Sequence, residues 1–198
     1  MNRPMIVENF ISQEDADILI QEMQSPSEVN PYPEYYAKRY GGTAFPYNKT
    51  VIDMLKKYGD KSNDIHKDVN GYKNRIYVFK AFGSRWTEGT KGGLHIDAQD
   101  PEAWIEWSTI IYLNSENDYE GGEIYFPNQD FVYKPKQYSA VFFPSAGSEY
   151  IHGVTEITSG ERFTALYMHT SDPVNADPDF EKDLPRNKDC WNYALANK

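Results

Sequence analysis

Two histidines and one aspartate in this chain have the types and spacing of a mononuclear metal site. The tripeptide His95-Ile96-Asp97 stands at the end of a predicted strand. Residues i and i+2 of a strand project to the same face, so this imidazole and carboxylate can reach one point in space. His-x-Asp alone occurs often by chance, and the simplest interpretation is a surface histidine beside an acidic residue. With His152 it gives two histidines and one carboxylate, the facial set that suits Fe(II) and leaves coordination positions open.

Arg162 is the fourth residue that could do chemistry. It follows His152 by ten residues, and the turn residues 158–160 between them predict a hairpin that brings both side chains to one cavity. A planar guanidinium is suited to a two-pronged grip on a carboxylate. The alternative is a core histidine and a surface ion pair between Arg162 and Glu161. The spacing of all four residues together favours a site.

The elements that must position these residues are mainly strands. After Asn70-Gly71 the chain alternates short apolar runs with turn residues about every ten positions, which favours a sandwich or barrel over βαβ units. The predicted strands are 75–82, 93–96, 107–113, 123–126, 131–133, 139–143, 151–157 and 162–170.

Helices are predicted only before the strands. Ser12 is a suitable N-cap for a helix that ends before Ser25, and helices are also expected over Thr50–Tyr58 and residues 62–68. The stretch 30–47, rich in Pro, Tyr and Gly, is expected to be irregular. We therefore expect a single domain over residues 1–198, with a helical part at about 1–70, a β core at about 74–170 and a C-terminal tail at 171–198.

Composition excludes several classes of function. The formal net charge of −10 argues against a nucleic acid or an anionic membrane surface as the main partner. The longest apolar runs have four residues, too short to cross a bilayer, and residues 1–10 contain no signal core. The single cysteine, Cys190, cannot form an intramolecular disulfide. The sequence predicts a soluble cytoplasmic protein.

Beyond these single features, an ordered set of motifs resembles the Fe(II)- and 2-oxoglutarate-dependent dioxygenases, and among them the prolyl 4-hydroxylase-like branch. The motifs lie in the expected order between about residues 75 and 170: His95-Ile96-Asp97, Ser108-Thr109-Ile110-Ile111-Tyr112-Leu113-Asn114, Gly121-Gly122-Glu123-Ile124-Tyr125-Phe126-Pro127, Ala140-Val141-Phe142-Phe143-Pro144, His152-Gly153-Val154 and Ser159-Gly160-Glu161-Arg162-Phe163.

The resemblance implies a mostly β fold with flanking helices, whose core is a double-stranded β-helix, or jelly roll. It implies that His95, Asp97 and His152 hold Fe(II) and that Arg162 holds the distal carboxylate of 2-oxoglutarate. It also implies a hydrogen bond from Tyr112 to this cosubstrate. O₂ is then the second cosubstrate, and ascorbate is an optional addition.

The implied activity is hydroxylation of a C–H bond, with release of succinate and CO₂. A prolyl residue of a peptide or protein is the usual target of this branch, and a small-molecule substrate is the alternative. Two other classes stay open: a non-catalytic jelly-roll module that binds a metal or ligand, and a purely structural β-sandwich. Arg162 separates them, because neither alternative needs a guanidinium directed at a cavity behind a metal. The oligomeric state is not readable from the sequence.

The segment Gly83–Gly93 is expected to be a mobile substrate loop. It contains four glycines and leads directly into His95. Arg85 and Trp86 are its candidate substrate contacts. The alternative is a rigid connection that only turns the chain.

Overall fold

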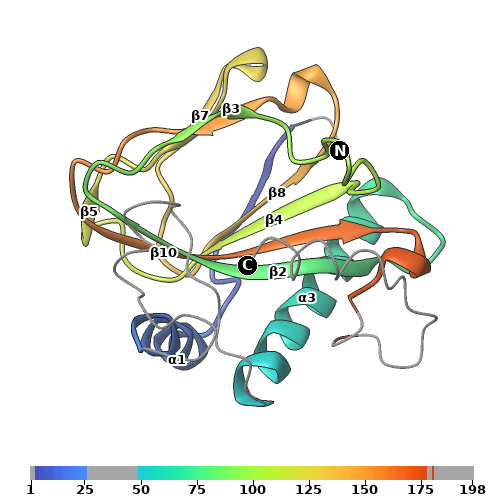
Figure 1. Cartoon of the computed structure of the whole chain (residues 1–198), viewed down its shortest axis with the longest axis horizontal. Coiled ribbons are helices and arrows are strands. Elements are labelled where there is room, and N and C mark those ends of the chain that lie inside the picture. The colour runs from blue at the N-terminus through green and yellow to red at the C-terminus, as the bar shows by residue number, and fades with distance from the viewer. Residues whose placement is uncertain (1–2, 26–48, 178–179, 181–198) are drawn as a thin grey trace.

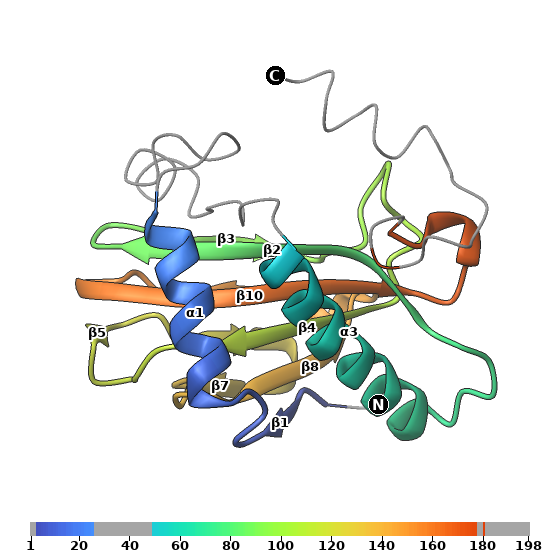
Figure 2. The same cartoon turned by 90° about the horizontal axis from the view of Figure 1, so that it is seen from below.

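The computed structural model describes residues 3–25, 49–177 and 180. The predicted irregular stretch 30–47, most of the predicted tail beyond residue 177, and Cys190 lie outside the described residues. Two antiparallel β-sheets face each other, and two helices cover the outer face of the larger sheet (Figures 1 and 2). The elements are β1 (Met5–Val7), α1 (Gln13–Gln24), α3 (Lys49–Asn70), β2 (Tyr77–Thr87), β3 (Gly92–His95), β4 (Trp107–Tyr112), β5 (Tyr119–Glu120), β6 (Ile124–Phe126), β7 (Phe131–Tyr133), β8 (Ala140–Pro144), β9 (His152–Val154) and β10 (Ser159–Thr170), with 3₁₀ turns at Pro127–Gln129, Ser148–Tyr150 and Pro173–Asn175.

The larger sheet has the order β1-β8-β4-β10-β2, and β5 pairs with one end of β10. The smaller sheet has the order β3-β9-β6-β7. The predicted hairpin between the His152 and Arg162 strands is therefore wrong, because β9 and β10 belong to different sheets. Both strands still flank the space between the sheets, so the chain crosses from one wall of a cavity to the other.

The two helices pack against the larger sheet through an apolar cluster. Ser12 caps α1 as predicted, since its side chain accepts a hydrogen bond from the backbone of Asp15. The two helices expected over 50–58 and 62–68 are one continuous helix, α3. Gly59 lies inside this helix, at a position where an added Cβ would lie 2.6 Å from Val78 Cγ2. This glycine allows a close approach of helix and sheet.

Apolar side chains fill both faces of the larger sheet. The cluster on its helical side includes Leu19, Leu55 and Phe142, while the cluster between the sheets includes Ile110 and Phe126. The sandwich is thereby a rigid frame for side chains that enter the inter-sheet space.

The segment Gly83–Gly93 is not the loop that we expected. Residues 83–87 belong to β2 and pair with β10, and Gly92 and Gly93 belong to β3. Only residues 88–91 connect the two strands. The composition suggested a loop because glycines are unfavourable in strands, but a long ladder to β10 holds this segment in register.

Short elements at both ends of the described chain were not predicted. β1 adds to the edge of the larger sheet by pairing with β8. At the other end, the backbone N–H of Asp177 donates to the carbonyl of Val78, and Phe180 enters the core. Among the described residues, no helix has both the length and the apolar character required to span a bilayer.

Candidate functional site

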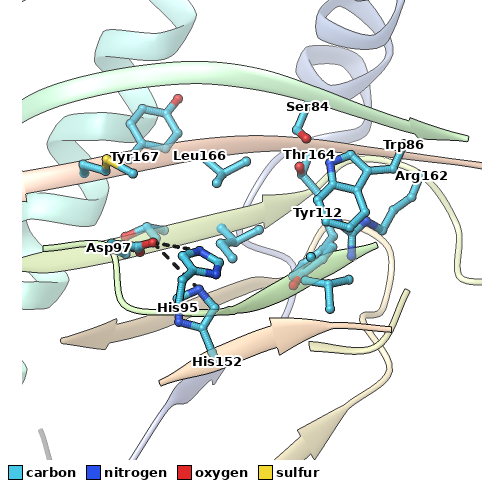
Figure 3. Close-up of a pocket in the computed structure, with 16 residues that line it drawn as sticks. Ser84, Trp86, His95, Asp97, Tyr112, His152, Arg162, Thr164, Leu166 and Tyr167 are labelled. Atoms are coloured by element: carbon cyan, nitrogen blue, oxygen red, sulfur yellow. Dashed lines mark hydrogen bonds and ion pairs between the residues drawn. The ribbon is translucent and has the colours of Figure 1, made fainter. Parts of the chain in front are cut away.

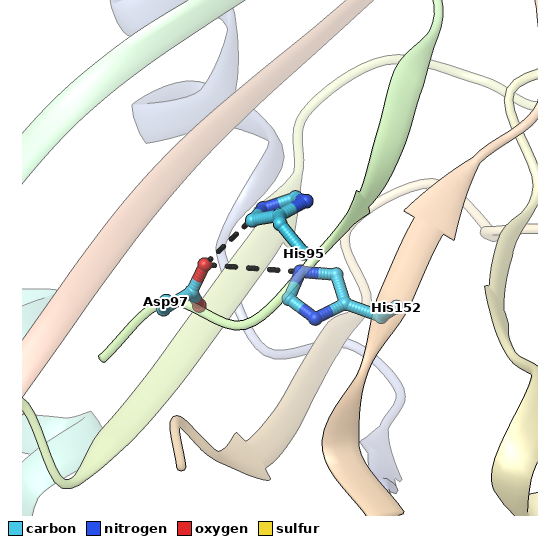
Figure 4. A group of neighbouring side chains, drawn as sticks. All are labelled: His95, Asp97 and His152. Atoms are coloured by element: carbon cyan, nitrogen blue, oxygen red, sulfur yellow. Dashed lines mark ion pairs between the residues drawn. The ribbon is translucent and has the colours of Figure 1, made fainter. Parts of the chain in front are cut away.

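His95, Asp97 and His152 meet at one end of the space between the sheets (Figure 4). Their potential ligand atoms all lie within 4.8 Å of one another. Asp97 Oδ1 is 3.4 Å from His95 Nε2 and 3.8 Å from His152 Nε2. His95 ends β3, His152 begins the neighbouring strand β9, and the two residues are paired in the ladder. Asp97 lies beyond β3, so it reaches the cluster from a bend and not from the strand we predicted.

Backbone carbonyls orient both imidazoles. His95 Nδ1 is 2.8 Å from the carbonyl oxygen of Gly93, and His152 Nδ1 is 3.1 Å from that of Tyr150. A carbonyl only accepts, so each Nδ1 carries the proton and donates it. In the neutral state of each ring, Nε2 then carries the lone pair that metal ligation requires, whereas a protonated His95 donates its Nε2–H to Asp97.

The electrostatics of the cluster favour an ionised aspartate. Burial opposes ionisation of Asp97, but hydrogen bonds from His95 and Ser108 and the nearby His152 hold its pKa below the ordinary value. The hydrogen bond to Asp97 raises the pKa of His95, while burial lowers the pKa of His152. The set combines an anionic oxygen with two nitrogens, the donor set of a borderline divalent cation.

A cavity of about 110 Å³ extends from this cluster to Arg162, which lies at its other end (Figure 3). Arg162 is 4% exposed, and its guanidinium carbon lies 4.4 Å from the ring centre of Trp86. One of its terminal nitrogens donates to the carbonyl of Gly122 at 2.8 Å. The predicted alternative, a surface pair with Glu161, is wrong, because Glu161 pairs with Arg85 and Arg162 is buried.

The cavity contains polar atoms that lack partners. Arg162 Nε and the hydroxyls of Tyr112 and Thr164 are buried, and none forms a hydrogen bond within the described part of the chain. No carboxylate among residues 3–25, 49–177 and 180 forms an ion pair with Arg162. Leaving a buried cation and buried hydroxyls unpaired is costly, and an anionic ligand would satisfy all three. The residues therefore fit a divalent metal at one end of the cavity and a carboxylate at the other.

The two predicted substrate contacts lie on opposite faces of β2. Trp86 lines the cavity, whereas Arg85, the preceding residue on β2, points to the other face and forms an ion pair with Glu161 at 2.7 Å. Alternation along a strand explains the difference. Arg85 therefore does not line this cavity, and its role as a substrate contact stays a prediction.

Three contributors to the cavity were not identified from the sequence. Ser108 donates to Asp97 Oδ2, Gly122 offers its carbonyl to Arg162, and Thr164 adds an unpartnered hydroxyl. Thr164 could have been found, since it stands two residues after Arg162 on the same strand face. Contacts of Ser108 and Gly122 depend on how distant strands are placed, which no local pattern reveals.

The other two histidines form a separate buried network. His66 on α3 and His169 on β10 lie with ring centres 4.8 Å apart, and the Nε2 atoms of both contact Thr109 Oγ1. His169 Nδ1 is 2.8 Å from Asn63 Oδ1. His169 does not line the cavity and contacts the helical side of the larger sheet. This network joins the helix to the sheet and takes no part in the site.

The comparisons agree with this geometry. Residues 81–169 match the 2OG-Fe(II) oxygenase superfamily. The chain is 34% identical over 118 residues to a PKHD-type hydroxylase of Parvibaculum lavamentivorans, covering 58% of this chain and 51% of that one. It is 36% identical over 137 residues to prolyl 3-hydroxylase 1 of Gallus gallus, covering 65% of this chain and 16% of the relative.

Solved structures add evidence about the fold. The viral collagen prolyl hydroxylase of Paramecium bursaria Chlorella virus-1 aligns with a TM-score of 0.60 at 20% identity, over 84% of this chain and 94% of that one. Together with the two sheets, this likeness confirms the double-stranded β-helix. Residues 81–169, which hold the candidate site, thus match the 2OG-Fe(II) oxygenase superfamily that the motifs resemble, and the similar proteins include a PKHD-type hydroxylase and prolyl hydroxylases. The chain spans about half the length of the PKHD-type relative and a smaller share of the prolyl 3-hydroxylase.

Proposed function

We propose that this protein is an Fe(II)- and 2-oxoglutarate-dependent oxygenase that hydroxylates a C–H bond. The observation that supports this most strongly is the buried guanidinium of Arg162, which has no paired anion among the residues that the structure describes and shares one cavity with the His95, Asp97 and His152 cluster. A module that only bound a metal would gain nothing from a buried unpaired cation beside it. A purely structural sandwich would gain nothing from either feature.

In this proposal His95, Asp97 and His152 are the Fe(II) ligands. When bound, the metal with its 2-oxo acid supplies the O₂-dependent oxidation of the substrate C–H bond, with succinate and CO₂ as coproducts. The protein fixes the orientation of the ligand side chains. The carbonyls of Gly93 and Tyr150 hold the imidazoles with Nε2 inward, so little reorganisation is needed when the cation binds.

At the other end of the cavity, Arg162 takes the distal carboxylate of 2-oxoglutarate. The carbonyl of Gly122 and the ring of Trp86 hold the guanidinium in place. Tyr112 and Thr164 direct unpartnered hydroxyls into the same space, and each can donate to a carboxylate oxygen. Burial raises the pKa of Tyr112, which keeps this hydroxyl protonated and able to donate.

Apolar side chains keep water from the cavity. Ile110, Val154 and Leu166 line it between the two polar ends. A dry environment strengthens the interaction between Arg162 and a carboxylate and protects the oxidation from side reactions.

The proposed substrate class is a prolyl residue in a peptide or protein. Its support is the similarity to prolyl 3-hydroxylase 1, whose name states that activity, beside the similarity to a PKHD-type hydroxylase. A small-molecule substrate uses the same metal ligands and is the second candidate. Because the relatives are distant and longer than the matched part, the assay must survey both classes.

The test is turnover of 2-oxoglutarate to succinate by the purified chain with Fe(II), with and without ascorbate, against panels of prolyl peptides and of free metabolites. Substrate-dependent succinate with a matching mass gain of one oxygen supports the proposal. His152→Ala should abolish it, and His169→Gln, which removes a histidine outside the cavity, should not. Turnover that survives His152→Ala with unchanged iron content would refute the assigned ligand set.

A further inference from the structure

Hydrogen bonds from outside β3 hold Asp97 in its orientation. It lies two residues beyond the end of β3, so no strand ladder fixes it. The next residue, Ala98, donates its backbone N–H to the carbonyl of Ser145 at 3.0 Å. Ser145 follows β8 and is itself anchored, because its N–H donates to the carbonyl of Glu106 at 3.0 Å. The bend that carries Asp97 is thus tied to the larger sheet.

The side chain of Asp97 is tied to the same sheet through two serines. Ser108 on β4 donates its hydroxyl to Asp97 Oδ2, and its oxygen lies 2.7 Å from Ser145 Oγ. Each hydroxyl has one proton, and the ionised carboxylate has none. Because Ser108 donates its only hydroxyl proton to Asp97, Ser145 must donate to Ser108. The result is a one-way chain of donors, Ser145 to Ser108 to Asp97, and both serines are buried.

This series of hydrogen bonds reaches only one of the two carboxylate oxygens of Asp97. Oδ2 receives the proton of Ser108, while Oδ1 faces Nε2 of both histidines. A carboxylate that binds a cation through both oxygens takes two coordination positions, and one that binds through a single oxygen takes one. With two histidines, the single-oxygen mode leaves three positions of an octahedral ion open.

We propose that Ser108 is a positioning residue that commits Asp97 to the metal through Oδ1 alone, with Ser145 as its support. This inference rests on the proposed function, because it assigns a role towards the cation of that same site. It predicts that the hydroxyl of Ser108 contributes to metal affinity and also sets the number of positions left for other ligands.

The experiment uses Co(II) as the probe, since its visible absorption reports on coordination number. Purified wild type, Ser108→Ala, Ser108→Thr, Ser145→Ala and Thr109→Val are titrated with Co(II), and their melting temperatures are measured without metal. Thr109 is the matched control: it is the next residue on β4, also buried, and its hydroxyl contacts the histidines of the helical side.

Ser108→Ala should weaken Co(II) binding by about 10- to 100-fold, in the range seen when outer-shell partners are removed, and should change the visible spectrum. Ser145→Ala should weaken it less, because Ser108 keeps its own proton. Ser108→Thr should retain the wild-type spectrum, and Thr109→Val should lower the melting temperature without changing Co(II) affinity.

Two results would overturn the inference. One is Co(II) affinity and a spectrum of Ser108→Ala equal to those of the wild type. The other is equal loss of affinity in Ser108→Ala and Thr109→Val, which would mean that only general stability had changed. Failure of the wild type to bind Co(II) at all would instead refute the proposed function.

Discussion

The buried histidine network predicts a pH dependence of stability that can be calculated. His169 is fully buried, and burial lowers its pKa to about 3. An unfolded histidine has a pKa of about 6.5. Between these two values the unfolded state binds a proton that the folded state does not, so the free energy of unfolding falls as the pH falls. The stabilisation is complete above pH 6.5 and is lost progressively below it.

The magnitude follows from the difference in pKa. pH 5 lies about 1.5 units below the pKa of an unfolded histidine, and protonation stabilises the unfolded state by about 1.4 kcal/mol for each unit. Between pH 7.5 and pH 5, His169 alone therefore lowers the free energy of unfolding by about 2 kcal/mol. Burial also holds the pKa of His66 well below its ordinary value, which adds a loss of the same sign. The carboxylates with lowered pKa, such as Asp15, lose their contribution only at lower pH.

Urea unfolding of wild type and His169→Gln at pH 7.5 and pH 5, both with chelator, isolates this contribution. Each protein serves as its own reference, so the cost of the substitution itself cancels. We expect the wild type to lose about 2 kcal/mol more than the variant between the two pH values. Equal losses in the two proteins would show that His169 titrates normally, and the buried network would then be wrongly described.

Other substitutions test the cavity and the turn beside it. Arg162→Ala should raise the apparent Michaelis constant for 2-oxoglutarate by one to two orders of magnitude, as expected for about 1.5–3 kcal/mol of charged hydrogen bonding, and Arg162→Lys should raise it less; an unchanged constant in steady-state assays would place the carboxylate elsewhere. We expect 2-oxoglutarate to change the tryptophan fluorescence of the wild type, because Trp86 covers Arg162, and we expect Trp86→Phe to abolish this change while binding stays measurable by calorimetry; an undiminished change would assign the signal to another tryptophan. Gly121→Ala should lower the free energy of unfolding by more than about 1 kcal/mol, because φ is +76° and the added Cβ would lie 1.8 Å from the carbonyl oxygen of Glu156. Gly71→Ala, with φ +64° and no atom within 4 Å, is the control and should cost less in the same denaturation experiment.

Local patterns predicted the residues of the site better than the route of the chain between them. The cap at Ser12 and the strand that carries Tyr112 follow from spacing and residue type, and the structure has both. The pairing of β9 and β10 was wrong, since turn residues between two strands predict a hairpin but do not show that the chain crosses to the other sheet. The predicted helices left residues 59–61 out, because the role of Gly59, a close contact with Val78, depends on a distant strand.

The same distinction separates the site residues that were found from those that were missed. His95 and Asp97 are near neighbours in sequence, so a motif can reveal them. Ser108 becomes informative only when β4 lies beside the bend that carries Asp97. Arg85 and Trp86 looked equivalent in a glycine-rich segment, and only the register with β10 shows which of them faces the cavity.

The most direct test of the central claim is visible absorption of the purified chain with Fe(II) and 2-oxoglutarate in the absence of O₂. The account predicts a weak charge-transfer band that requires both additions, disappears in Asp97→Ala, and needs a higher concentration of 2-oxoglutarate in Arg162→Ala. No band in the wild type at saturating Fe(II) and 2-oxoglutarate, or an unchanged band in Asp97→Ala, would contradict it.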